Sequence, residues 1–130
     1  MSEKKYKILI VDDDKFLLDM YPVKFNQLGF DVTTSLGAVE ALTKLREGLN
    51  PDVILTDILM PAMDGFEFLE KISEENLATK AKIVILSNKG ERSDIDRGMA
   101  LGADGYIIKA SVVPSEVVEK VMQILEGDRG

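Results

Sequence analysis

The amino-acid sequence predicts an α/β domain in which helices cover both faces of a five-stranded parallel sheet. Five short apolar runs alternate along the chain with five segments of helical spacing, which is the order expected of a parallel sheet. The runs mostly lack a polar residue at every second position, as expected of strands buried on both faces. The 130 residues suit a single core, so we expect one domain over residues 1–130, with its core in 6–126 and no further domain.

The predicted strands are the apolar runs, which are rich in Ile, Val and Leu and have the length of strands rather than helices. Right-handed crossovers between parallel strands leave few topologies for five of them. In chain order, the strands are Lys7–Val11, Phe30–Thr34, Asp52–Thr56, Lys82–Leu86 and Gly105–Ile108.

Each run is followed by a segment whose apolar residues recur at the spacing of one helix face. Gly29, Gly48 and Gly102 are expected to end the first, second and fourth helices, and the fifth follows Pro114. Pro22 lies inside the first helix, which we expect it to kink or split. The predicted inward residues are Phe16, Leu17, Met20, Phe25 and Leu28, then Val39, Leu42 and Leu45, then Phe66, Leu69 and Ile72, then Ile95, Met99 and Leu101, and finally Val117, Val118, Val121 and Leu125.

Composition and charge exclude several classes of function. The net charge is −7 and the lysines are scattered, so we expect no direct nucleic-acid binding. The chain has no cysteine and no histidine, which excludes thiol chemistry and removes the commonest general base. The apolar runs are too short to span a bilayer, and residues 1–5 do not begin a signal peptide. We therefore expect a cytoplasmic protein that does not contact membranes.

Polar side chains follow the predicted strands at their carboxyl ends, where open parallel sheets bind ligands. Asp12 and Asp13 follow the first strand, and Asp57 follows the third; Ser87 and Lys109 follow the fourth and fifth. Each has an ordinary structural explanation, since acids cap helices or form turns, a serine caps a helix, and a lysine can simply be solvated. Their common place at one edge of the sheet makes coincidence a poor explanation.

The carboxylates of Asp12, Asp13 and Asp57 would repel one another by about 1 kcal/mol or more per pair at a few ångströms; Asp14 is better explained as a helix N-cap. Such a cluster must raise a pKa, bind a cation, or both. Lys109 supplies only one positive charge, so we expect Mg²⁺, a hard cation that prefers oxygen ligands. Together with a hydroxyl and a lysine, the site is suited to phosphate.

Four motifs then carry a resemblance to a known family: "ILIVDDD", "DVILTDILMPAMDG", "IVILSN" and "GADGYIIKA". In this order and spacing, the chain resembles the receiver domain of bacterial response regulators in two-component signalling. It is similar to the stand-alone chemotaxis regulator type, and the resemblance covers Lys7–Leu125. It implies a flavodoxin-like fold with strand order 2-1-3-4-5.

The resemblance implies a role for each acid. Asp57 would be the phosphoacceptor, forming an aspartyl phosphate. Asp13 and Asp57 would bind Mg²⁺ directly, together with the backbone carbonyl of Leu59, and Asp12 would hold the metal through water or position it. The chain would not be an enzyme acting on external substrates, but would undergo self-catalysed phosphotransfer and autodephosphorylation.

The remaining roles concern the phosphoryl group and its consequences. Ser87 and Lys109 would bind phosphoryl oxygens, and Tyr106 would be the aromatic switch residue; a half-buried tyrosine packing on the last helix would be compatible with that role. The donor would be a phosphohistidine on a sensor histidine kinase or a phosphotransfer protein. Phosphorylation would change the face built from the fourth helix, fifth strand and fifth helix, which controls a downstream protein or an output domain.

Three residues depart from the family pattern. Ala110 stands where a proline, commonly in a cis bond, usually follows the lysine, and a cis bond before alanine costs about 3 kcal/mol, so we expect a trans bond here. This departure bears on how Lys109 is aimed and on how the following loop meets a kinase. Asn88 follows Ser87 in place of a small residue, and we expect it to narrow access to Asp57. Pro22 disturbs a helix that family kinases tend to contact.

Three other functions are compatible with an α/β fold of this kind. A receiver that is never phosphorylated would act as a protein-interaction module, but such receivers usually lack the acids or the lysine. An aspartyl-phosphate hydrolase would need a second aspartate two residues after Asp57, where this chain has Leu59. A nucleotide-binding domain would need glycines after the first strand, where the sequence reads "DDDK".

Overall fold

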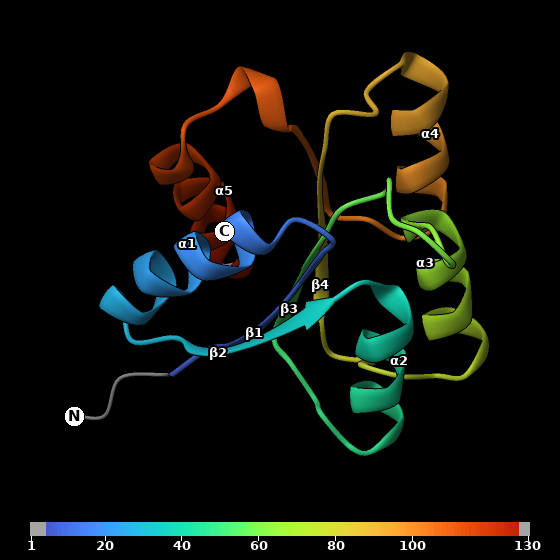
Figure 1. The fold of residues 1–130 in the computed structure, drawn as a ribbon, viewed down its shortest axis with the longest axis horizontal. Coiled ribbons are helices and arrows are strands. Elements are labelled where there is room, and N and C mark those ends of the chain that lie inside the picture. Colours follow the sequence, from blue (N-terminus) through green and yellow to red (C-terminus); the bar gives the residue numbers. More distant parts are fainter. Residues whose placement is uncertain (1–4, 128–130) are drawn as a thin grey trace.

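The computed structural model describes residues 5–127, which form one parallel sheet between two layers of helices (Figure 1). The strand order is β2-β1-β3-β4-β5, which confirms the predicted fold class. In chain order, the elements are β1 Lys7–Asp12, α1 Lys15–Gln27, β2 Asp31–Leu36, α2 Ala38–Arg46, β3 Val53–Thr56, α3 Gly65–Glu74, β4 Lys82–Ser87, α4 Arg92–Ala100, β5 Gly105–Ile108, the 3₁₀ turn Lys109–Ser111 and α5 Pro114–Glu126.

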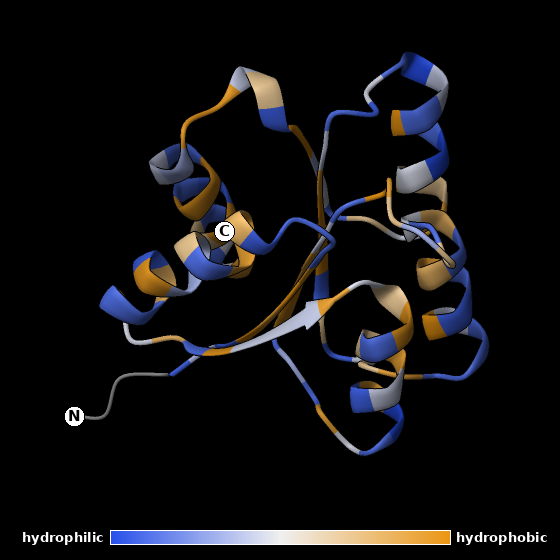
Figure 2. Ribbon diagram, viewed as in Figure 1, coloured by the Kyte–Doolittle hydropathy of each residue, from blue (hydrophilic) through white to orange (hydrophobic). Residues whose placement is uncertain are grey.

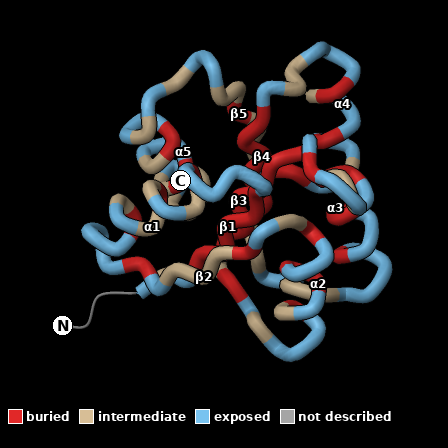
Figure 3. The backbone as a smooth tube through the Cα atoms, in the orientation of Figure 1, coloured by how far each residue is buried: buried red, intermediate tan, exposed pale blue. Residues whose placement is uncertain are grey.

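The central strands are buried on both faces, which explains why their sequences do not alternate. Helices α1 and α5 cover one face of the sheet, while α2, α3 and α4 cover the other (Figure 1). In β1, Ile8 and Ile10 pack on the α1–α5 side, whereas Leu9 and Val11 pack on the opposite side. The strands at the centre are accordingly hydrophobic (Figure 2) and buried along their length (Figure 3).

Helix α1 buries a narrower face than the sequence predicts. Leu17, Tyr21 and Phe25, spaced four residues apart, are buried, and this spacing places them on one stripe of the helix. Phe16 and Leu28 were predicted to face inward but are 74% and 54% exposed, because they lie at the ends of the helix, off that stripe. Despite Pro22, the helix continues from Lys15 to Gln27, so it is not split.

Helix α4 buries a small and a polar residue, and of the three apolar residues predicted for it Ile95 and Leu101 are partly buried. Its buried residues are Asp94 and Gly98, while Met99 is 46% exposed. A Cβ atom on Gly98 would lie 2.7 Å from Ile85 Cδ1, so the helix approaches the sheet closely because this residue has no side chain. Val39 of α2 was also predicted to face inward, but it is 54% exposed.

Three strands extend further than predicted; the extension of β2 ends at Leu36, and the other two reach the predicted site. β1 includes Asp12 and β4 includes Ser87, so these two side chains are held by the sheet itself rather than by loops. The ends of the predicted domain, residues 1–4 and 128–130, lie outside the described residues. None of the helices within residues 5–127 combines the length and apolar composition needed to cross a membrane.

The loop after β3 returns to the sheet at Gly65, where α3 begins. The amide of Gly65 donates a hydrogen bond to the carbonyl of Ile58 at 2.9 Å. A Cβ atom at this position would lie 2.3 Å from the carbonyl oxygen of Asp57 and 2.8 Å from Ile58 Cα. Both obstacles are backbone atoms, so only glycine lets the helix start this close to Asp57.

We expect the substitution Gly65→Ala to lower the free energy of unfolding by about 1–3 kcal/mol, because the backbone at Asp57 must move to admit a methyl group. Urea denaturation measures the change. Gly127→Ala is the matched control, since a Cβ atom there meets nothing within 4 Å, and it should change the stability by no more than about 0.5 kcal/mol. Equal stabilities for the two variants would contradict this explanation.

Candidate functional site

The register of the sheet brings the predicted polar residues to one edge. Val11 pairs with Thr56 in neighbouring strands, so the residues that follow them, Asp12 and Asp57, lie side by side. The amide of Asp57 continues this ladder by donating to the carbonyl of Val11 at 3.0 Å. On the other side of β3, Ser87 pairs with Ile108. The carboxyl ends of four adjacent strands therefore meet, as the sequence predicts.

Lys109 joins two of the acids. Its Nζ atom lies 2.9 Å from Asp12 Oδ2 and 3.0 Å from Asp57 Oδ2. Asp12 and Asp57 are 1% and 5% exposed, so the lysine compensates charges that water does not reach freely. A trans peptide bond before Ala110, as predicted, is therefore compatible with a lysine aimed at the site, and no cis bond occurs among the described residues.

Backbone amides hold the second oxygen of each buried acid. Asp57 Oδ1 accepts hydrogen bonds from the amides of Ile58, at 2.6 Å, and Leu59, at 3.3 Å. Asp12 Oδ1 accepts one from the amide of Asp14 at 3.0 Å. Sequence reasoning missed these amide donors, because backbone direction in a loop leaves little trace in residue type. Asp14 itself caps α1 by accepting from the amide of Phe16, as predicted.

The electrostatics of the site show like charges held together with incomplete compensation. Burial raises the pKa of Asp12 above its usual value and the charge of Asp57 adds to this, although the hydrogen bond from Lys109 opposes the rise. Burial alone would lower the pKa of Lys109, but its hydrogen bonds to Asp12 and Asp57 outweigh burial and raise that pKa. The lysine therefore stays charged, while the acids still repel each other.

The acids also fit a metal ion. Asp12, Asp13 and Asp57 each offer a carboxylate oxygen, and these atoms all lie within 4.8 Å of one another. Asp13 is exposed, while the other two are buried, so the cluster opens to solvent on one side. A set of carboxylate oxygens that admits water suits Mg²⁺, which keeps several waters when bound. The role of the Leu59 carbonyl remains a prediction.

Ser87 and Tyr106 lie beyond the acids, toward α4. Ser87 is fully buried, and its Oγ atom accepts a hydrogen bond from the amide of Lys89 at 3.2 Å. The hydroxyl of Tyr106 donates to the carbonyl of Lys89. The ring of Tyr106 packs beside Gly98 of α4, because its side chain leaves β5 on the α4 face. It does not take the ordinary structural role considered for it, that of a half-buried tyrosine on the last helix.

Asn88 contacts Ala110, another of the three residues that depart from the family pattern. Its Oδ1 atom accepts a hydrogen bond from the amide of Ala110 at 2.8 Å. Sequence reasoning considered the two residues separately and missed this link. The available indication was that Ala110 has an amide proton, which the usual proline lacks.

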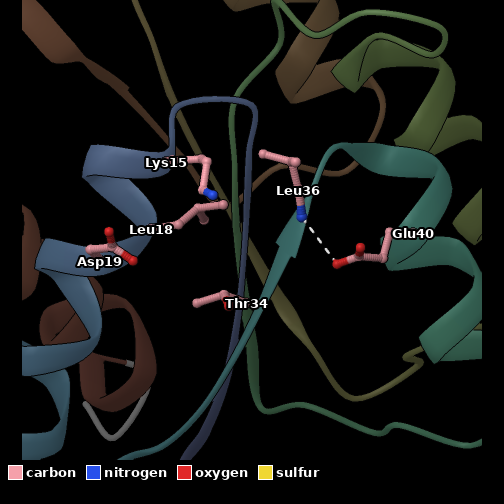
Figure 4. Close-up of a pocket in the computed structure, with 6 residues that line it drawn as sticks. All are labelled: Lys15, Leu18, Asp19, Thr34, Leu36 and Glu40. Atoms are coloured by element: carbon pink, nitrogen blue, oxygen red, sulfur yellow. Dashed lines mark hydrogen bonds between the residues drawn. The ribbon is translucent and has the colours of Figure 1, made fainter.

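A surface pocket lies beside this edge, between α1 and α2 at the end of β2 (Figure 4). The amide of Leu36 donates to Glu40 Oε2 at 3.1 Å across its rim. None of the predicted site residues lines this pocket; the lining residues are Lys15, Leu18, Asp19, Thr34, Leu36 and Glu40. It is therefore separate from the acidic cluster.

A doubly covered parallel sheet with three acids and a lysine at one edge defines a receiver-type domain. Residues 8–122 match the family model of the response regulator receiver domain, and the chain belongs to this family. Solved structures agree. A CheY-like receiver domain protein from Methanospirillum hungatei has a TM-score of 0.85 and 31% identity over 95% of this chain and 96% of its own. TrrA from Thermotoga maritima, solved in complex with Mg²⁺ and BeF, has a TM-score of 0.77 and 32% identity over 92% of this chain and 98% of its own.

Similar sequences include regulators of transcription. The transcriptional regulatory protein PhoP of Bacillus subtilis is 35% identical over 92% of this chain and 48% of its own length. The DNA-binding response regulator MtrA of Mycobacterium tuberculosis is 34% identical over 93% of this chain and 51% of its own. The chain thus spans about half the length of these relatives.

The relatives contradict our expectation of no direct nucleic-acid binding. MtrA is named as a DNA-binding response regulator, and PhoP and the PhoB protein of Rhizobium meliloti as transcriptional regulatory proteins. The prediction was wrong because it used the charge of these 130 residues alone. That charge describes the surface of a receiver domain, whereas the relatives extend over about as much chain again outside the matched part.

We expect Mg²⁺ to stabilise the protein, because an ion bound among the three acids relieves their repulsion only in the folded state. At a concentration 100 times its dissociation constant, Mg²⁺ should raise the free energy of unfolding by about 2.7 kcal/mol, as measured by urea denaturation. Asp13→Asn should weaken this response but leave the metal-free protein at least as stable, since a like charge is lost.

Asp31→Asn is the matched control, because Asp31 is exposed and begins β2 at the opposite end of the sheet. It should respond to Mg²⁺ like the unsubstituted protein. An equal response in the Asp13 and Asp31 variants would refute the assignment of Asp13 as a ligand.

Proposed function

We propose that this domain is the phosphoacceptor of a two-component system or phosphorelay, and that it takes a phosphoryl group onto Asp57 from a phosphohistidine of a partner protein in the cytoplasm. The observation that supports this most strongly is the cluster in which Lys109 Nζ contacts both Asp12 and Asp57 beside the exposed Asp13. Residues 5–127 would act together as one receiver domain. The domain would turn over no external substrate.

In the transfer step, a carboxylate oxygen of Asp57 forms a bond to phosphorus while the bond between phosphorus and the donor nitrogen breaks. The electron pair returns to that nitrogen, and the imidazole, protonated at its other nitrogen, leaves as a neutral group. The chain needs no general base, because the carboxylate attacks in its ionised form. Its task is to position the groups and compensate charge.

The carboxylates of Asp12, Asp13 and Asp57 and the carbonyl of Leu59 are the groups that we assign to Mg²⁺. When bound, this ion supplies positive charge next to the phosphoryl oxygens, which is its usual contribution to phosphoryl transfer. Asp12 and Asp57 hold fixed positions for this purpose, since each has one oxygen on a backbone amide and the other on Lys109.

After transfer, the phosphoryl group on Asp57 carries about two negative charges. Lys109 then turns from the carboxylate to a phosphoryl oxygen, and the hydroxyl of Ser87 donates to another. In the structure, Ser87 Oγ accepts a hydrogen bond from the amide of Lys89, and the carbonyl of Lys89 accepts one from the hydroxyl of Tyr106. A movement of Ser87 toward phosphate would therefore disturb the contact that holds Tyr106, which is how we propose that the signal reaches the face built from α4, β5 and α5.

Incubation with acetyl phosphate and Mg²⁺, followed by intact-mass spectrometry, tests the acceptor. We expect the mass of one phosphoryl group to be added to the unsubstituted protein. We expect no such addition when Mg²⁺ is chelated before the incubation or in the variant Asp57→Asn. The Asp31→Asn control should be phosphorylated normally. Phosphorylation that persists in the Asp57 variant would refute the assignment, and no phosphorylation at all would favour an interaction module.

Binding of beryllofluoride, which imitates the phosphoryl group, should change backbone NMR signals well beyond the site. We expect shifts along α4, β5 and α5, including Tyr106 and Gly98, because the Lys89 carbonyl links the loop after Ser87 to the tyrosine ring. Shifting most molecules to the second state requires a preference of about 5 kcal/mol. Changes confined to the residues around Asp57 would contradict the proposed switch.

A further inference from the structure

We propose that Asn88 is a positioning residue for Lys109. Its side-chain carbonyl holds the first turn after β5, so that the lysine ammonium stays directed at Asp12 and Asp57. The central observation is the hydrogen bond from the amide of Ala110 to Asn88 Oδ1, with a donor–acceptor distance of 2.8 Å. The effect on phosphoryl binding rests on the proposed function, whereas the hydrogen bond itself does not.

The backbone at this point needs an external partner. Lys109 to Ser111 form a single 3₁₀ turn, and the amides of the first residues of such a turn have no acceptor within it. The amide of Ala110 is one of these, and Asn88 satisfies it. Because a backbone amide can only donate, the asparagine must present its oxygen there, which fixes the orientation of the side chain.

Two further contacts join the same two segments. The hydroxyl of Tyr106 donates to the carbonyl of Lys89, and Gly90 lies so close to Ile108 that a Cβ atom would meet its Cδ1 atom at 2.2 Å. Residues 106 and 108 project from the same face of β5, since alternate side chains of a strand share a face. The loop after β4 therefore lies along β5 from Tyr106 to Ala110, and Asn88 makes the last contact in this series.

This contact lies between the two groups that would bind the phosphoryl oxygens. Asn88 directly follows Ser87, and Ala110 directly follows Lys109. A hydrogen bond between the two neighbours fixes the serine hydroxyl and the lysine ammonium relative to each other without occupying either. Asn88 and Ala110 are both exposed, so their bond contributes little to the core, and its loss should affect the aim of Lys109 more than stability.

The two residues depend on each other. A smaller residue in place of Asn88 could not reach the turn, and a proline in place of Ala110 would have no amide proton to donate. Two of the three departures from the family pattern, Asn88 and Ala110, thus form one feature, a hydrogen-bonded trans turn that carries the lysine.

Amide hydrogen exchange measured by NMR tests the bond directly. We expect the Ala110 amide to exchange about three- to tenfold faster in Asn88→Ala, and to recover its protection in Asn88→Asp, which keeps an acceptor oxygen. Asn50→Ala is the control, since Asn50 is exposed and precedes β3 at the other end of the sheet. Unchanged exchange in Asn88→Ala would overturn the proposal.

The positioning role is tested by NMR titration with beryllofluoride in the presence of Mg²⁺. Asn88→Ala should weaken binding by about three- to tenfold without a change in the urea midpoint, and Asn50→Ala should leave both unchanged. In an Ala110→Pro background, Asn88→Ala should cost nothing further, because the donor is already gone. Unchanged affinity in Asn88→Ala, or an equal loss in both backgrounds, would overturn the role.

The titration also separates this proposal from the proposed function. If the unsubstituted protein neither binds beryllofluoride nor takes up phosphate, the proposed function fails and the positioning role fails with it. The exchange of the Ala110 amide still decides whether Asn88 holds the turn.

Discussion

The site depends on one ammonium group placed between two buried carboxylates. Lys109 Nζ contacts Asp12 and Asp57, and the lysine comes from the far side of β4, since β5 is the edge strand. Three strands are thus joined across their carboxyl ends by one side chain. Without it, two buried acids would face each other uncompensated, a costly arrangement. Until a ligand binds, Lys109 compensates the charge of the two buried acids, so that the sheet can keep both of them at its edge.

One lysine compensates only part of the negative charge of the cluster, since a third acid, Asp13, lies beside the other two and is exposed to solvent. A fully neutralised cluster would have no affinity for a cation. A cluster with excess negative charge would resist folding unless its carboxylates were held by fixed donors. The amides of Ile58 and Leu59 at Asp57 provide such donors, and Gly65 lets α3 begin close enough to keep that loop compact. Backbone geometry therefore stabilises charge that side chains leave unbalanced.

The sequence predicted the sheet and the location of the site because both follow from local patterns: apolar runs such as Val53–Thr56 and acids directly after them. It predicted helix faces less well. Met99 and Val39 are exposed and Gly98 is buried, since the contact of α4 with the sheet depends on how closely two backbones approach, and apolar spacing does not encode that distance. Contacts between distant residues, such as Asn88 with Ala110, were missed for the same reason. The prediction of no direct nucleic-acid binding failed because the net charge of these 130 residues describes the receiver domain alone.

The proposed function makes the turn after β5 more important in the phosphorylated state than in the resting one. At rest, the carboxylates of Asp12 and Asp57 both fix the ammonium of Lys109. After transfer, the lysine must exchange the Asp57 carboxylate for a phosphoryl oxygen, and a metal ion among the acids would weaken its attraction to Asp12. Its side chain then loses the partners that directed it, while its backbone remains where Asn88 holds Ala110. A lysine whose ammonium changes partners needs a fixed backbone position. In this chain we assign that task to the hydrogen bond between the Asn88 side chain and the Ala110 amide.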